Sequence, residues 1–107
     1  MGLSTHVLDL VSGQPVRDLS LRVALAGQAQ ADFVTDADGR CADLCQGAPL
    51  LAGTHTLYFE VGAYFAARGI ETFYDSVPIT VVVTDPERHY HVPLLLSPFG
   101  YSTYRGS

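Results

Sequence analysis

The chain has 107 residues, of which 48% are hydrophobic and 16% are charged, a composition that suits one domain with a single core over residues 1–107. Its formal net charge is −5, and its six Lys and Arg residues form no basic stripe that could neutralise a phosphate backbone, so we expect no nucleic-acid partner. No apolar run approaches the roughly 20 residues that span a bilayer, and the N-terminal residues do not resemble a secretion signal, so we expect a cytoplasmic protein that does not enter a membrane.

Two strands are predicted in the N-terminal third of the chain. Apolar residues alternate with small or polar residues over residues 4–11 and 19–25, which is typical of half-buried strands. Turn residues follow at 13–15 and 36–39. Cys41 and Cys45 are separated by three residues, without a second pair for a zinc site and without redox spacing, so we expect free thiols.

The C-terminal half is predicted to contain further strands and one helix. Alternation over residues 56–61, 79–84 and 90–97 predicts strands. Between them, residues 63–69 predict a short helix that Gly69 ends in a left-handed cap, and this helix needs packing to be stable. Short strands at this spacing predict a mostly β fold, a sandwich or a barrel.

The predicted strand over residues 89–97 has one ordinary face and one unusual face. Alternation places Tyr90, Val92, Leu94 and Leu96 on one face, which is the expected core. The other face carries two imidazoles, those of His89 and His91, next to apolar residues, so we expect a second protein surface to cover part of it.

The last seven residues, 101–107, alternate again and predict an edge strand that ends at Ser107. An edge strand exposes unpaired backbone groups, and pairing with a symmetry mate is one way to cover them. We expect the terminal carboxylate to be ordered, and a tag after Ser107 to damage activity more than a tag at Met1.

Taken singly, the titratable residues indicate little. An isolated histidine such as His6, among apolar neighbours, is more often structural than catalytic, and His55 and His89 are interpreted as surface or strand-entry residues. Arg40 follows a turn that by itself predicts only a solvated hairpin tip. His89 and His91 could also be two ligands of a metal, although no Asp or Glu lies close by in sequence to complete the site.

The chain nevertheless resembles a known family. Its last residues, HYHVPLLLSPFGYSTYRGS from His89 to Ser107, are similar to the C-terminal region of the 5-hydroxyisourate hydrolases, or transthyretin-like proteins, including their Tyr-Arg-Gly-Ser ending. LSTHVLD (3–9) resembles the family's first strand, TDADGR (35–40) its arginine-bearing turn, and residues 62–69 and 73–74 its short helix and the segment after it. Residues 24–33 and 41–51 depart from the family pattern.

This resemblance implies a transthyretin-like β-sandwich of two four-stranded sheets with one short helix, assembled as a homotetramer (a dimer of dimers) with sites in a channel between subunits. It implies hydrolysis of 5-hydroxyisourate to 2-oxo-4-hydroxy-4-carboxy-5-ureidoimidazoline in urate breakdown, without a cofactor or a metal. The family's catalytic residues correspond to His6, Arg40 and His91. Tyr104 and Ser107 complete the implied substrate-binding set, and Tyr104 lies in the signature that separates these enzymes from the hormone carrier transthyretin.

The expected chemistry follows from these residue types. A histidine whose pKa is near neutral can activate water, and we expect His6 and His91 to share the proton transfers, in roles that the sequence does not assign. The planar guanidinium of Arg40 suits bidentate contact with ring carbonyls and with the negative charge that develops on them. Three alternatives remain: a transthyretin-type binding protein, a metal-dependent amidohydrolase using His6, His89 and His91, and a purely structural sandwich.

Overall fold

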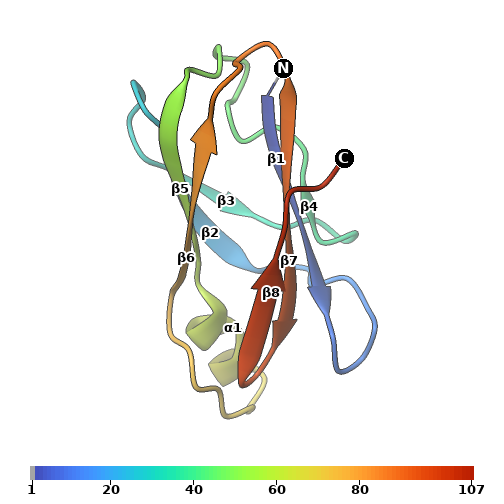
Figure 1. The fold of residues 1–107 in the computed structure, drawn as a ribbon. Helices are drawn as coiled ribbons and strands as arrows, with labels where there is room; N and C mark the ends of the chain where they lie inside the picture. The colour runs from blue at the N-terminus through green and yellow to red at the C-terminus, as the bar shows by residue number, and fades with distance from the viewer. Residues whose placement is uncertain (1) are drawn as a thin grey trace.

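The predicted alternation becomes two facing sheets in the structure, a computed structural model that describes residues 2–107 (Figure 1). One sheet has the order β4-β1-β7-β8, with β1 Gly2–Asp9, β4 Arg40–Cys41, β7 His89–Ser97 and β8 Gly100–Thr103. The other has the order β3-β2-β5-β6, with β2 Ser20–Ala24, β3 Ala31–Val34, β5 Gly53–Phe59 and β6 Val77–Val83. Two four-stranded sheets confirm the expected sandwich.

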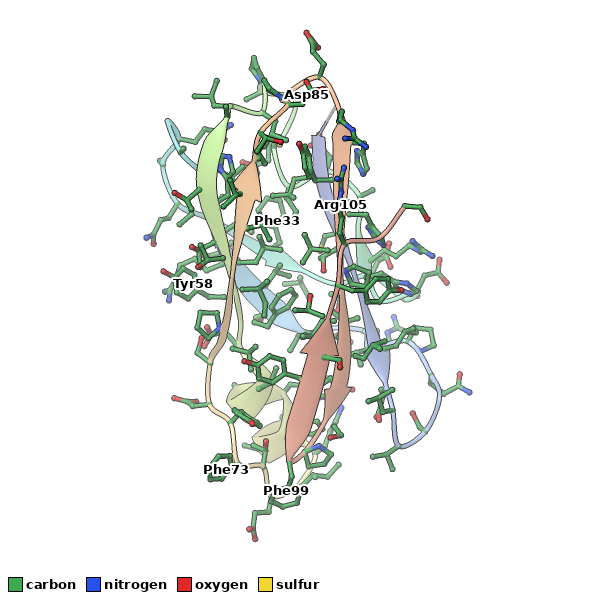
Figure 2. The ribbon with its side chains drawn as sticks, viewed as in Figure 1. Phe33, Tyr58, Phe73, Asp85, Phe99 and Arg105 are labelled. Carbon is green, nitrogen blue, oxygen red and sulfur yellow. The ribbon has the colours of Figure 1, made fainter. Side chains whose placement is uncertain are left out.

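The side chains between the sheets form the core. The predicted inner face of β7, which consists of Tyr90, Val92, Leu94 and Leu96, is buried, as expected. It faces apolar residues of the other sheet such as Leu57 and Phe59, and Figure 2 shows Phe33 of β3 between the two layers. Burying each large apolar side chain contributes about 1.5–3 kcal/mol, which makes this core the main source of stability.

The pairing of β1 with β7 positions the site. These two strands run parallel, so that Ser4 lies opposite His91 and His6 opposite Pro93. On its other edge β1 pairs antiparallel with β4, which places His6 opposite Arg40. Residues from three distant parts of the chain therefore meet on the outer face of one sheet.

The helix is close to its predicted position. Helix α1 spans Val61–Ala67 and so begins two residues earlier than the predicted 63–69. The sequence pattern assigned Val61 to the end of the preceding strand, but it is the first helical residue and its side chain is buried in the core. The backbone N–H of Gly62 donates to the carbonyl of Asp75, which holds the first turn. Gly69 has φ 69°, which confirms the left-handed cap. No helix within residues 2–107 is long and apolar enough to cross a membrane.

Two predictions about strands were incomplete. β8 is an edge strand, as expected; its regular pairing ends at Thr103, and Gly106 lies opposite His91 in the same antiparallel register along β7. β3 and β4 were not predicted, because four and two residues are too short to show a period of two.

His55 is not a surface residue. Only 1% of it is exposed, and its Nδ1 accepts from the backbone N–H of Ala26 at 3.0 Å while its Nε2 lies 2.8 Å from the carbonyl of Leu51. Both ring nitrogens are therefore occupied within the fold. His55 does lie near the start of β5, as expected, but the surface interpretation was wrong because its ring bridges two loops, at Ala26 and Leu51.

Both cysteines are free and buried, in agreement with the prediction of free thiols. Burial, and then the nearby Asp36 carboxylate, raises the pKa of the Cys41 thiol to about 11, and burial also raises the pKa of Cys45. With that pKa, Cys41 is about one-thousandth thiolate at pH 8, and the thiolate is the reactive form. We expect Cys41 to react with a disulfide reagent at least about 100-fold more slowly in the folded protein than in denaturant, and Cys45 also to react more slowly when folded. Equal rates would contradict this.

Candidate active site

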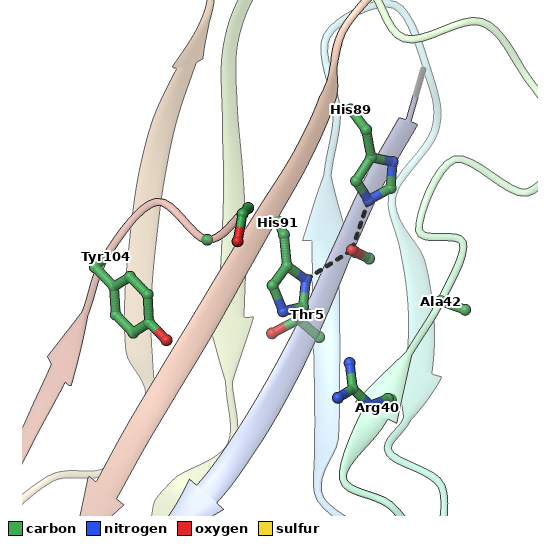
Figure 3. Close-up of a pocket in the computed structure, with 9 residues that line it drawn as sticks. Thr5, Arg40, Ala42, His89, His91 and Tyr104 are labelled. Atoms are coloured by element: carbon green, nitrogen blue, oxygen red, sulfur yellow. Dashed lines mark hydrogen bonds between the residues drawn. The ribbon is translucent and has the colours of Figure 1, made fainter.

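A cavity of about 510 Å³ lies on the outer face of the β4-β1-β7-β8 sheet (Figure 3). The lining carries several polar side chains and comes from four parts of the chain: β1, β4, β7 and the C-terminal tail. The residues that matter for chemistry are Ser4, Arg40, His89, His91, Tyr104 and Ser107. Four of the five residues carried over from the family resemblance therefore share one cavity.

Ser4 connects the two imidazoles of β7. Its Oγ lies 2.8 Å from Nδ1 of His91 and 2.9 Å from Nε2 of His89. His89 and His91 are two residues apart on β7, so both rings project on the same face, and Ser4 fits between them from the neighbouring strand. Sequence reasoning did not identify Ser4 or assign His89 to the site, because the contact depends on the pairing of strands more than 80 residues apart.

The C-terminal tail covers the imidazole of His91. The backbone N–H of Gly106 donates to the carbonyl of His91 at 2.8 Å. A Cβ on Gly106 would lie 2.5 Å from Cδ2 of His91 and 3.2 Å from Cγ of Pro93, so the tail packs directly on this face. The cover expected over the histidine face is thus provided in part by the chain itself. It also places Ser107 at the cavity.

Arg40 is placed by a tight turn. Asp36 Oδ1 accepts from the backbone N–H of Asp38 and of Arg40, each at 2.9 Å. Gly39 has φ 73°, and a Cβ there would lie 2.5 Å from the carbonyl oxygen of Val7, so only glycine fits this close approach. Within residues 2–107, the guanidinium of Arg40 forms no ion pair, and it remains available to a ligand.

His6 lies at the border of the cavity and not in its lining. It projects on the same face as Ser4, one step of about 7 Å further along β1, between Arg40 and Pro93 on the flanking strands. His6, Arg40 and His91 thus lie on three adjacent strands, although the cavity is centred on the last two. No group of three or more His, Cys, Asp or Glu within the described residues is arranged to hold a metal ion.

The surroundings of His91 favour its neutral form. Partial burial lowers the pKa of His91 below its usual 6.5, and the nearby positive charge of Arg40, followed by the effects of His6 and His89, lowers it further. The neutral imidazole has one ring nitrogen with a free lone pair, which can accept a proton. His91 is therefore suited to act as a base near neutral pH.

Replacing Gly106 by alanine tests whether the tail positions His91. The added Cβ would force the imidazole or the tail to move, and a displacement of about 1 Å at a reacting group can cost 100-fold, so we expect kcat/KM to fall about 10- to 100-fold. Gly100→Ala is the matched control, because its Cβ would make an ordinary contact of 3.7 Å with Ser97 Oγ. Similar thermal midpoints with activity lost in Gly106→Ala alone would support positioning, and full activity in Gly106→Ala would exclude it.

Comparisons with known proteins find relatives over nearly the whole chain. The 5-hydroxyisourate hydrolase of Caulobacter vibrioides is 45% identical over 114 residues, which cover 99% of this chain and 98% of the relative. The structure of Klebsiella pneumoniae 5-hydroxyisourate hydrolase superposes with a TM-score of 0.88 at 41% identity, covering 98% of this chain and 92% of that one. Sea bream transthyretin, solved in complex with thyroxine, superposes with a TM-score of 0.84 at 32% identity, covering 99% and 95%.

The sequence profile of the HIUase/Transthyretin family matches residues 3–106, nearly the whole described chain. Its span includes β1 and β7, which carry the histidines of the site, the turn that carries Arg40 and the tail as far as Gly106. Together with the full-length relatives, this match confirms the resemblance seen in the sequence: the chain belongs to the HIUase/Transthyretin family.

Proposed function

We propose that the chain hydrolyses 5-hydroxyisourate, opening its ring in urate breakdown without a cofactor. The observation that carries this proposal is the grouping of two imidazoles, a guanidinium without an ion-pair partner among residues 2–107 and hydroxyl groups around one cavity. Such a lining suits a small, oxygen-rich ligand that reacts, whereas a carrier of apolar ligands needs an apolar lining. Full-length relatives named as 5-hydroxyisourate hydrolases support the same substrate.

In the proposed reaction His91 is the general base. Its Nε2 takes a proton from water, the resulting hydroxide attacks a ring carbonyl carbon, and the carbonyl electrons move onto oxygen. Arg40 stabilises that developing charge by charge-assisted hydrogen bonds. The carbon–nitrogen bond then breaks, and the leaving nitrogen receives a proton from a histidine. His6, next to Arg40 on β1, is proposed to orient the water or to donate this proton.

A direct assay tests the activity. Freshly generated 5-hydroxyisourate decays slowly by itself, and loss of its ultraviolet absorbance should accelerate in proportion to the concentration of purified protein. The transthyretin-type alternative predicts binding without acceleration. Unchanged decay at micromolar protein would overturn the proposed function, and activity retained after exhaustive chelation would eliminate the metal-dependent alternative.

Tyr104 and Ser107 are proposed to donate hydrogen bonds to the substrate. Both line the cavity, and Tyr104 is 58% exposed, so its hydroxyl is accessible. Removing one hydrogen bond of about 1 kcal/mol should lower kcat/KM about 5- to 10-fold in Tyr104→Phe and in Ser107→Ala. Tyr58→Phe, on the opposite sheet, is the control and should behave as the parent. Parent-like kcat/KM in both site variants would argue against these contacts.

We also propose that the protein is a homotetramer. The strands β6 and β8 are the last in their sheets, and each therefore leaves one row of backbone groups without a strand partner. At the lower end of the molecule in Figure 2, Phe73 and Phe99 are 76% and 63% exposed, an apolar surface that association would cover. A solution mass of about four chains by light scattering would support this, and a monomer would contradict it.

A further inference from the structure

We propose that Ser4 and His89 are positioning residues that connect the base, His91, to solvent through a chain of hydrogen bonds. This inference rests on the proposed function, in which His91 takes a proton from water, and adds a route for that proton. The geometry that supports it is the pair of contacts at Ser4 Oγ, 2.8 Å to His91 and 2.9 Å to His89 (Figure 3).

The hydroxyl of Ser4 restricts the tautomers of both rings. A hydroxyl has one proton to donate and two lone pairs that accept, so at most one of the two rings can accept from Ser4 and at least one must donate to it. If Ser4 donates to His89 Nε2, then His91 donates through Nδ1–H and its Nε2 keeps a free lone pair. That is the arrangement a base requires, and the opposite one would leave Nε2 of His91 protonated.

The two histidines also differ in exposure, and this difference gives proton transfer along the hydrogen bonds a direction. His89 is exposed, whereas His91 is only partly so and lies under Gly106. When Nε2 of His91 has taken a proton from water, its Nδ1 proton can pass to Ser4 Oγ while the Ser4 proton passes to His89 Nε2. His91 is then neutral in its Nε2–H form, and the charge rests on His89, which can release a proton to solvent. Donation of the Nε2 proton to the leaving nitrogen, with the same transfers in reverse, restores the starting tautomers.

Other charged and polar groups lie near this chain of hydrogen bonds without interrupting it. Arg40 from β4 and His6 from β1 lie beside His91, and the tail brings Tyr104 and Ser107 to the cavity. Arg105 points elsewhere, since its guanidinium lies 4.6 Å from the centre of the Tyr90 ring. The positive charge of Arg40 opposes a lasting charge on His91, which favours transfer toward the more distant His89.

The first experiment reads the tautomers without turnover. Nitrogen-15 NMR of the histidine rings should show His91 protonated at Nδ1 and free at Nε2 above its pKa, and the titrations of His89 and His91 should be coupled. In Ser4→Ala the coupling should disappear and the tautomer of His91 should become mixed. A wild-type His91 protonated at Nε2, or spectra that Ser4→Ala leaves unchanged, would overturn the inference whether or not the protein hydrolyses 5-hydroxyisourate.

The second experiment measures the route. His89→Gln keeps a hydrogen-bonding group and cannot take the proton, and because His89 is exposed the variant should fold. In dilute buffer we expect kcat to fall about tenfold at unchanged KM in His89→Gln and Ser4→Ala, and added imidazole to restore it in His89→Gln. Ser4→Thr keeps the hydroxyl and should recover most activity, and Ser97→Ala, whose hydroxyl contacts Gly100 instead, should be unaffected. Parent-like kcat in His89→Gln at every buffer concentration would contradict a proton route through this residue.

Discussion

Arg40→Ala is expected to fold normally and to lose about 10²–10³ of its turnover, which corresponds to roughly 3–4 kcal/mol of transition-state stabilisation. The side chain is exposed and forms no ion pair within residues 2–107, so little folding energy depends on it. Its backbone, by contrast, is held by Asp36, and those hydrogen bonds do not depend on the side chain. The measurement is kcat and KM on fresh 5-hydroxyisourate, with the thermal midpoint as a check of folding.

Two further variants test whether the loss of turnover is specific to the guanidinium of Arg40. Arg40→Lys keeps the charge and loses the planar fork, and it should recover only part of the activity. Arg17→Ala removes an arginine whose exposed contact with Asp18 is 3.6 Å long, and such surface pairs contribute little, so its activity should equal that of the parent. If Arg40→Ala kept more than about a third of the parent kcat, charge stabilisation by Arg40 would be excluded.

Alternation along the long strands predicted a sandwich or a barrel, because these strands carry the information locally, and the family resemblance selected the sandwich. The alternating residues of β2, β5 and β7 each mark a buried face, and the buried set of β7 is the one predicted. The ends of elements depend on tertiary contacts instead. Val61 continues the alternation of β5, yet it begins the helix because Gly62 bonds to Asp75 from a later segment.

The site could be predicted only in part. His91, Arg40, Tyr104 and Ser107 were found through the family motifs, and the structure groups them around one cavity. Nothing in the sequence marked Ser4 as a site residue, because a serine in a strand indicates a function only when the residue opposite it is known. The parallel pairing of β1 with β7 decides that this residue is His91.

The close approach of Gly106 to His91 is hidden in the same way. Alternation of the tail predicted a continued strand, and Gly106 does lie opposite His91 in the register of β8, but alternation does not show which residue of β7 it meets. The pairing of distant segments depends on long-range contacts that a local pattern does not encode.

His91→Asn is expected to lower kcat by about 10²–10⁴, the usual contribution of a general base, while the fold and the association state persist. Asparagine can place its amide near the position of Nδ1 and keep the contact with Ser4, which is 2.8 Å in the parent, but it has no equivalent of Nε2. The variant therefore removes the proposed base and little else. Turnover on fresh substrate gives the effect, and light scattering shows whether the assembly is retained.

The pH dependence provides a separate check on the same residue. Because burial and then Arg40 lower the pKa of His91, its neutral form persists below pH 6.5, so kcat/KM should be constant above that pH and fall only at more acidic pH. The unfolded chain binds this proton more readily than the folded one, so the stability due to neutral His91 is complete above about 6.5 and is lost as pH falls through the lowered pKa. Arg40→Ala removes a positive charge and should move the acid midpoint of its residual activity upward. A midpoint above 6.5 in the parent, or one that Arg40→Ala moves downward, would show that a group other than His91 accepts the proton.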